Sequence, residues 1–166
     1  MAMDVLTMDL PDEGATLRLG RAIGTSATAG TLLTLSGDLG AGKTTLVRGL
    51  AEGLEVPGGV SSPTYVLMQL HEGGRLPLSH FDAWMEGRER AYLADGADEL
   101  LAADGVAVIE WAERVEEWLP EARLGLELLH APGGGRRARL VAVGEAHSVL
   151  LGLVRAELGL PGPGSP

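Results

Sequence analysis

Apolar positions follow two periods along this chain, and together they predict a succession of strands and helices. A strand is expected where apolar residues alternate with polar ones or form a short continuous run, and a helix where they recur three or four positions apart. The expected strands are residues 5–10, 30–37, 105–111, 123–131 and 136–144. The expected helices are residues 12–29, 43–54 and 88–104, a segment that follows residue 111 and runs through Trp118, and residues 145–160.

Two hairpins complete the pattern. Extended runs within residues 65–84 flank Glu72-Gly73-Gly74, and the last two strands bracket a turn of sequence PGGG. Strands that alternate with helices and also form hairpins predict an α/β fold, here a three-layer domain around a mixed parallel and antiparallel central sheet. The 166 residues are enough for a single domain with a sizeable core. We expect this domain to span residues 1–159, with residues 160–166 forming a disordered tail.

Composition narrows the classes of function. The chain holds no cysteine, which excludes disulfides, thiolate metal sites and cysteine nucleophiles. No apolar run approaches the roughly 20 residues that span a bilayer, and the first residues lack the pattern of a signal peptide, so we expect a cytoplasmic protein without membrane attachment. A net charge of −10 argues against direct binding of DNA or RNA. The one small basic cluster, GGGRRAR at 133–139, is interpreted as a hairpin turn with an exposed strand, with an RNA-facing patch as the alternative.

The segment LTLSGDLGAGKTTLVRGLAEGL, residues 33–54, holds the only lysine of the chain, whereas the other twelve of the 13 Lys and Arg residues are arginines. Gly37, Gly42, Lys43 and Thr44 fit the pattern G-x-x-x-x-G-K-[ST], between an expected buried strand and an expected amphipathic helix. Such a loop curls so that its backbone N–H groups and the positive end of the following helix face phosphate oxygens. The sequence therefore predicts a P-loop NTPase-like domain that binds the phosphates of a nucleotide.

The pattern also assigns roles to the loop residues. Lys43 is expected to reach the β- and γ-phosphates, because an ammonium on a slim stem can thread between phosphates, whereas arginine is a wide planar fork. Thr44 is expected to complete a Mg²⁺ shell with its hydroxyl group, and Thr45 to lie on the α-phosphate side. The other expected nucleotide-binding residues of the loop are Asp38, Leu39, Gly40, Ala41 and Gly42.

A P-loop also needs an acid for its metal ion and a group that positions water. Glu110 ends an apolar strand in the manner of a Walker B element, and Asp82 is a second candidate; which of the two contacts Mg²⁺ directly stays open. The alternative for each is a carboxylate that caps a helix or faces solvent. Thr64, in the loop SSPTY, is a candidate sensor of the γ-phosphate, with a plain turn as the alternative.

Four motifs, GDLGAGKTTLVRGL, SPTYVL, HFD and IEW, occur in this order and at these separations in the bacterial TsaE (YjeE) ATPases, which the chain resembles over about residues 8–118. The resemblance implies a small ATPase, weak alone and stimulated by its partners, that is required for the threonylcarbamoyladenosine modification of tRNA. It also implies binding to the TsaB–TsaD heterodimer, in which TsaD performs the threonylcarbamoyl transfer. The tRNA would then be reached only indirectly, through these partners.

Carried over by motif, the resemblance implies ATP or ADP and Mg²⁺ as cofactors. It makes Lys43, Asp82 and Glu110 the catalytic residues, and Thr44, Glu110 and Asp82 the metal site. By the same resemblance, Asp82 would assist either the metal ion or the attacking water.

Further residues follow from the same resemblance. His80 and Trp111, the neighbours of the two acids, are expected near the nucleotide or the partner surface, and Thr64 would be the switch threonine. Glu13 and Thr16 are weaker candidates for approaching the base.

The chain departs from the family pattern at three places. The usual HFDLYR is here HFDAWMEG, with Trp84 in place of tyrosine and Met85 in place of arginine. The usual IEWPE is here IEWAER, and Ser61 stands before SPTY where a basic residue is common. These changes bear on partner affinity and hydrolysis rate, and not on nucleotide binding.

Two other functions are compatible with a P-loop. A small-molecule or nucleotide kinase would need an acceptor pocket and usually an arginine-bearing lid, and no arginine-rich insertion of that kind is present. A nucleotide-dependent assembly switch would use the same loop with hydrolysis only incidental. We expect an ATPase, with these two functions as the alternatives.

Overall fold

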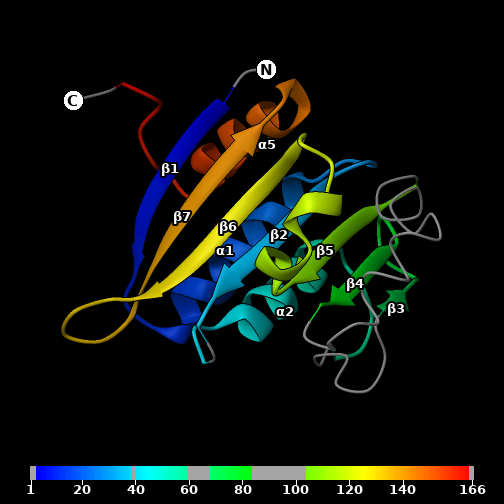
Figure 1. The fold of residues 1–166 in the computed structure, drawn as a ribbon, viewed down its shortest axis with the longest axis horizontal. Coiled ribbons are helices and arrows are strands. Elements are labelled where there is room, and N and C mark those ends of the chain that lie inside the picture. Colours follow the sequence, from blue (N-terminus) through cyan, green and yellow to red (C-terminus); the bar gives the residue numbers. More distant parts are fainter. Residues whose placement is uncertain (1–2, 39, 60–67, 84–103, 165–166) are drawn as a thin grey trace.

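The central feature of the fold is a seven-stranded sheet, formed within the residues that the computed structural model describes, 3–38, 40–59, 68–83 and 104–164 (Figure 1). The strands are β1 (Met3–Leu10), β2 (Leu32–Gly37), β3 (Met68–His71), β4 (Leu78–Asp82), β5 (Val106–Glu110), β6 (Arg123–His130) and β7 (Arg136–Val143). With them come the α-helices α1 (Glu13–Ser26), α2 (Lys43–Gly53) and α5 (Glu145–Glu157) and the 3₁₀ turns η2 (Ala112–Arg114) and η3 (Glu116–Trp118).

The strand order is β1-β7-β6-β2-β5-β4-β3. The inner strands β6, β2, β5 and β4 run parallel to one another, whereas β1, β7 and β3 pair antiparallel with their neighbours. The mixed sheet and both hairpins expected from the sequence are confirmed. Because β2, β5 and β4 are parallel and adjacent, their carboxyl ends, with Gly37, Glu110 and Asp82, meet at one edge of the sheet.

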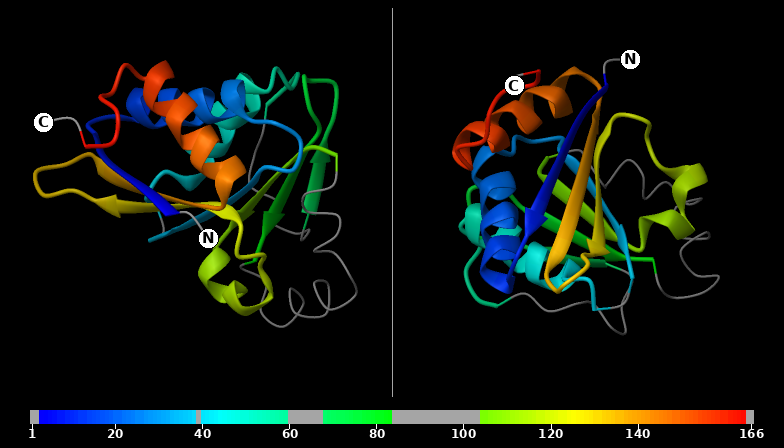
Figure 2. Two further views of the ribbon diagram at one scale, coloured as in Figure 1. Left: turned by 90° about the horizontal axis from the view of Figure 1, so that it is seen from above. Right: turned by 90° about the vertical axis from the view of Figure 1, so that its left-hand side faces the viewer.

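Successive residues of the inner strands contribute to two cores on opposite faces of the sheet. On one face lie α1, α2 and α5 (Figure 2), and there Leu33 and Val108 are buried against the helices. On the other face, Leu32 and Phe81 pack with Val115 from the turns that follow β5. Both faces of β2 are covered near its start, so residues on both faces are apolar there. This explains why the sequence of β2 is a continuous apolar run.

The helices α1 and α2 cross at very short distance because glycines lie at the crossing. A Cβ atom on Gly20 of α1 would lie 2.2 Å from the carbonyl oxygen of Leu46, and one on Gly49 of α2 would lie 2.3 Å from that of Leu17. Any side chain at these positions would push the helices apart. The crossing therefore fixes α2, and the loop that precedes it, against α1.

The helix expected to run through Trp118 is replaced by two 3₁₀ turns, η2 and η3. Val115, between them, has φ −127° and ψ 14°, which interrupts a helical backbone, and its side chain is fully buried. The segment is also short, because Pro120 follows closely. A helix of so few residues would gain little from the cooperativity of helix formation. Packing of Val115 against the sheet therefore decides the local structure.

Two further expectations bear on the extent of the fold. The helix expected over residues 88–104 lies almost wholly outside the described residues. Across the described ranges, every helix is too short or too polar to cross a membrane.

Candidate functional site

The segment between β2 and α2 forms the loop that the sequence predicts. Gly37, Gly40 and Gly42 have φ angles of 136°, 76° and 101°, a region that side-chain-bearing residues rarely adopt. At Gly37 the space is also closed, since a Cβ atom there would lie 2.3 Å from the carbonyl oxygen of Leu128. The glycines of the motif are thus required by the backbone of the loop, and Gly42 leads directly into the first turn of α2.

A cavity of about 320 Å³ opens above this loop. Its described lining consists of Gly40, Ala41, Gly42, Lys43, Thr44, Thr45, Glu110 and Trp111. Loop residues, the strand-end acid and the neighbouring tryptophan therefore come together, as the sequence predicts. Asp38, His80 and Asp82 stand close by without lining the cavity, and the predictions for Leu39 and Thr64 concern positions outside the described residues.

Lys43 is a buried charged group of the site, with 6% of its surface exposed. Its ammonium donates to the carbonyl oxygens of Gly37 and of Asp38, the latter at 3.1 Å. Burial lowers the pKa of Lys43 from its ordinary value, and nearby carboxylates, first that of Glu113, oppose the shift. The lysine is therefore held inside the loop by backbone oxygens, in a place where phosphate oxygens could replace them.

Trp111 forms one wall of the cavity. It directly follows β5 and has φ 58° and ψ 38°, an unfavourable backbone region for a bulky residue. In this conformation the indole lies over the Lys43 ammonium, with 3.6 Å between Nζ and the ring centroid. Strained residues of this kind cluster at functional sites, and here the strain places an aromatic face against the charge of the loop.

Glu110 is fixed by a buried partner. Its Oε2 lies 2.6 Å from Nε2 of His80, and the two side chains are 3% and 0% exposed. Asp82 is aligned with Glu110 across the parallel strands β4 and β5. Among the described residues the other ring nitrogen of His80, Nδ1, has no hydrogen-bond partner. His80 thus holds the carboxylate of Glu110 in place and does not itself belong to the described lining of the cavity.

The donor atoms of the site suit a hard cation. The hydroxyl of Thr44 and the carboxylate of Glu110 line one cavity, with Asp82 aligned beside Glu110, and oxygen ligands are what Mg²⁺ prefers. In the part of the chain that is described, no group of three acidic or histidine side chains could hold a metal ion by itself. Mg²⁺ at phosphate sites takes only one or two protein ligands, with phosphates and water supplying the rest.

A second cavity, of about 330 Å³, continues from the loop toward the start of α1. It shares Gly40, Ala41, Gly42 and Thr45 with the first cavity, and its other lining residues are Leu10, Pro11, Asp12, Glu13, Thr16, Gly135 and Arg136. Asp12 caps α1 by accepting a hydrogen bond from the N–H of Ala15 at 2.8 Å. Glu13 and Thr16, the candidates for approaching the base, thus lie beside the loop.

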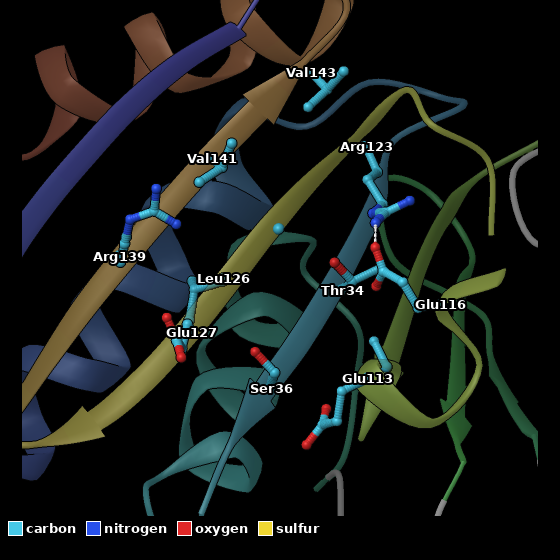
Figure 3. Close-up of a pocket in the computed structure, with 12 residues that line it drawn as sticks. Thr34, Ser36, Glu113, Glu116, Arg123, Leu126, Glu127, Arg139, Val141 and Val143 are labelled. Atoms are coloured by element: carbon cyan, nitrogen blue, oxygen red, sulfur yellow. Dashed lines mark hydrogen bonds and ion pairs between the residues drawn. The ribbon is translucent and has the colours of Figure 1, made fainter.

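A third cavity, about 370 Å³, is a groove on the opposite face of the sheet (Figure 3). Strands β2, β6 and β7 form its floor, and the side chain of Glu116, which pairs with Arg123, lies at one side. It is larger than the cavity at the loop but contains none of the predicted phosphate-binding residues. Glu113 lines this groove, and it is also the carboxylate that raises the pKa of Lys43 most, against the lowering by burial.

Two residues near the loop were not expected from the sequence. Glu113 follows the IEW motif closely, so its proximity to the acids of the site could have been inferred from its position alone. Arg136 lies in the β6–β7 hairpin and donates to the Gly40 carbonyl at 2.9 Å. No local signal in GGGRRAR distinguishes this arginine from its neighbours.

Comparison with known proteins gives consistent relatives. Residues 10–138 match the model of a family described as threonylcarbamoyl adenosine biosynthesis protein TsaE. Proteins named tRNA threonylcarbamoyladenosine biosynthesis protein TsaE are 41% identical in Bacillus subtilis, covering 75% of this chain and 77% of the relative, and 44% identical in Streptomyces coelicolor, covering 69% and 79%. The crystal structure of YdiB from Bacillus subtilis is similar in fold, with a TM-score of 0.79 and 30% identity over 94% of this chain and 97% of that one.

Proposed function

Because the chain belongs to the TsaE family, whose role is in tRNA threonylcarbamoyladenosine biosynthesis, we propose that its phosphate loop binds ATP with Mg²⁺ and hydrolyses the nucleotide in support of that modification. The observation that carries the proposal is the cavity in which the loop backbone, Lys43, Thr44 and Glu110 converge. A binding site for a nucleoside triphosphate requires a glycine-rich loop, a helix N-terminus, an ammonium group and an acid.

In this proposal each residue has a distinct task. The start of α2 and the loop N–H groups receive the phosphates, and the ammonium of Lys43 exchanges its carbonyl partners for β- and γ-phosphate oxygens. Thr44 and Glu110 would hold Mg²⁺, with Asp82 beside them, and the ion would neutralise the charge that develops on the phosphates. His80 keeps the carboxylate of Glu110 oriented toward the cavity.

Hydrolysis proceeds by attack of a water oxygen on the γ-phosphorus. The bond from phosphorus to the β–γ bridging oxygen breaks, ADP leaves with that electron pair, and inorganic phosphate is released. In this proposal, Asp82 and Glu110 orient the water and accept its proton. Because two acids share this edge of the sheet, the two tasks of holding the ion and orienting water can be divided between them.

We also propose that the partner is the TsaB–TsaD heterodimer, in the cytoplasm, with tRNA contacted only through it. The net charge of −10 supports this indirect route, since a protein that grips the tRNA backbone itself needs a basic surface. The relatives are named as proteins of tRNA threonylcarbamoyladenosine biosynthesis, and we therefore seek the partner among the proteins of that pathway.

The test is release of phosphate from labelled ATP, measured with and without purified TsaB–TsaD from the same organism. We expect slow release alone, faster release with the partners, and loss of release in Lys43→Ala and Glu110→Gln. Transfer of label to a metabolite instead of free phosphate would show a kinase. Repeated modification cycles supported by a Glu110→Gln variant that still binds ATP would show an assembly switch.

A further inference from the structure

The three arginines of the basic cluster at 133–139 do not all lie on one face of the sheet: Arg137 and Arg139, two positions apart on β7, share a face, and Arg136 lies on the other. Arg136 donates to backbone carbonyl oxygens, Arg137 pairs with the carboxylate of Asp9 at 2.9 Å, and Arg139 lies on the outer face of the sheet (Figure 3). A patch for RNA phosphates would present these groups together. The cluster therefore divides into separate contacts, and Arg136 is the member that reaches the phosphate loop.

Arg136 is held at a fixed place in the sheet. It is the first residue of β7 and pairs with His130 of β6 and with Leu10 of β1. The preceding residue, Gly135, has φ 72°, and a Cβ atom there would lie 2.8 Å from the carbonyl oxygen of Leu10. The base of the hairpin is thus pressed against the end of β1, at the edge of the sheet where the loop lies.

The guanidinium of Arg136 bridges the hairpin and the loop. One nitrogen, Nη1, donates to the carbonyl of Gly135 at 2.8 Å, and the other, Nη2, donates to the carbonyl of Gly40 at 2.9 Å. Nε is buried and has no partner among the described residues. A donor group that carries charge makes shorter and stronger hydrogen bonds than a neutral one, so this is a firm attachment for a glycine-rich loop.

The attachment continues inside the loop. The peptide unit that carries the Gly40 carbonyl also carries the N–H of Ala41, which donates to the carbonyl of Asp38 at 3.0 Å. The same Asp38 oxygen accepts a hydrogen bond from Lys43. Because a peptide unit is planar, holding its carbonyl also fixes its N–H. A chain of three hydrogen bonds therefore connects Arg136 to the lysine of the phosphate site.

We propose that Arg136 is a positioning residue for the phosphate site: it fixes the Gly40–Ala41 peptide and so holds the loop in the curvature that receives phosphates. The proposal rests on the nucleotide-binding function proposed above. A loop with three glycines at positive φ has many accessible conformations, and without this attachment the ligand would have to order the loop as it binds. Arg136 acts on phosphates through the backbone, without contacting them.

The experiment compares Arg136→Ala and Arg136→Lys with the neighbouring control Arg137→Ala, whose side chain meets only Asp9 in the interactions described. Isothermal titration calorimetry measures the Kd for ADP and, separately, for inorganic tripolyphosphate. For Arg136→Ala we expect both Kd values to rise by about tenfold, the loss of one charge-assisted hydrogen bond. Arg136→Lys should show a smaller rise in both, and Arg137→Ala no change.

The two probes separate positioning of the loop from direct contact with the nucleoside. If the Kd for ADP rises while that for tripolyphosphate stays constant, Arg136 contacts the nucleoside and the proposal is wrong. It is equally wrong if neither Kd changes in a variant whose thermal unfolding matches the wild type. If Arg136→Ala does not fold, the same two outcomes are read from Arg136→Lys.

Amide hydrogen exchange gives a readout that needs no ligand. In Arg136→Lys we expect faster exchange of amides at 40–44 while the interior of α1 keeps its protection, and unchanged exchange in the loop would overturn the proposal. A wild-type protein that binds neither ADP nor tripolyphosphate would instead refute the proposed function. The exchange comparison would still decide whether Arg136 holds the loop.

Discussion

The Nζ atom of Lys43 lies 3.6 Å from the centroid of the Trp111 ring, and the backbone of Trp111 adopts a left-handed conformation to make this contact. The ammonium is thus shared among an aromatic face and two loop carbonyl oxygens, in a cavity that has room for phosphates. A ligand that draws Lys43 toward phosphate oxygens changes the electrostatic field at the indole. Trp111 should therefore report binding.

Addition of ADP is expected to change the intrinsic tryptophan fluorescence of the wild-type protein. Trp111→Phe should lose most of the change, because the reporting ring is gone, while Trp118→Phe should keep it, because it leaves the Trp111 ring beside the Lys43 ammonium in place. Titration by fluorescence checks both variants. A change that persists in Trp111→Phe would place the reporter elsewhere.

His80 is expected to stabilise the fold through Glu110. Removing the imidazole in His80→Ala leaves a buried carboxylate without its partner at 2.6 Å, which should reduce the free energy of unfolding by about 2–4 kcal/mol. His80→Gln retains a donor and should lose less. Urea unfolding measures both, and the double variant His80→Ala with Glu110→Gln should recover part of the loss because the buried charge that had lost its imidazole partner is removed. Equal stability of His80→Ala and wild type would contradict this role.

The close crossing of α1 and α2 gives a prediction with an internal control. Gly20→Ala places a methyl group 2.2 Å from a backbone oxygen and should destabilise the protein by at least about 1–3 kcal/mol. Gly152→Ala lies within α5 where nothing approaches within 4 Å, so it should stabilise by about 0.5–1 kcal/mol. Thermal unfolding of the two variants should shift in opposite directions; a shift in the same direction would show that the crossing is not closely packed.

Stability should fall as the solution becomes acidic, through His147. Its Nε2 accepts the N–H of Leu32 at 3.1 Å, and burial lowers its pKa from 6.5. The folded state therefore binds fewer protons than the unfolded state, so the contribution is complete above pH 6.5 and is lost as the pH falls through the lower folded value. His71, whose pKa is lowered by burial and by His80, contributes with the same sign.

Urea midpoints between pH 7.5 and 5 test this dependence. His147→Gln keeps an acceptor for Leu32 but does not titrate in this range, so its midpoint should depend less on pH than that of the wild type. An identical slope in both proteins would show that His147 does not carry the effect.

The candidate site was largely predictable because its signal is local. Strand β2, the loop and α2 are contiguous in the sequence, so the spacing of Gly37, Gly42 and Lys43 is enough to predict how these residues are arranged. Glu110 could be placed with them because the ends of adjacent parallel strands share one edge of a sheet. That step needed only the expected strand and the order of the motifs.

Contacts set by strand order were not predictable in the same way. Arg136 and Gly40 are 96 positions apart, and His147 and Leu32 are 115 apart. Their proximity follows from β6 and β7 joining the sheet beside β2, which no local pattern records. The short 3₁₀ turns escaped prediction for a related reason, since the burial of Val115 depends on the partner face that it meets.

The central claim is that the loop around Lys43 grips nucleotide phosphates, and calorimetric titration of ATP with Mg²⁺ tests it most directly. Wild-type protein should bind, and Lys43→Ala should bind about a hundredfold more weakly, since two charge-assisted hydrogen bonds to phosphate are lost. Lys43→Arg should be similarly impaired, because a planar guanidinium does not fit between the phosphates. Absence of binding in the wild type, or equal affinity in a folded Lys43→Ala variant, would contradict the account.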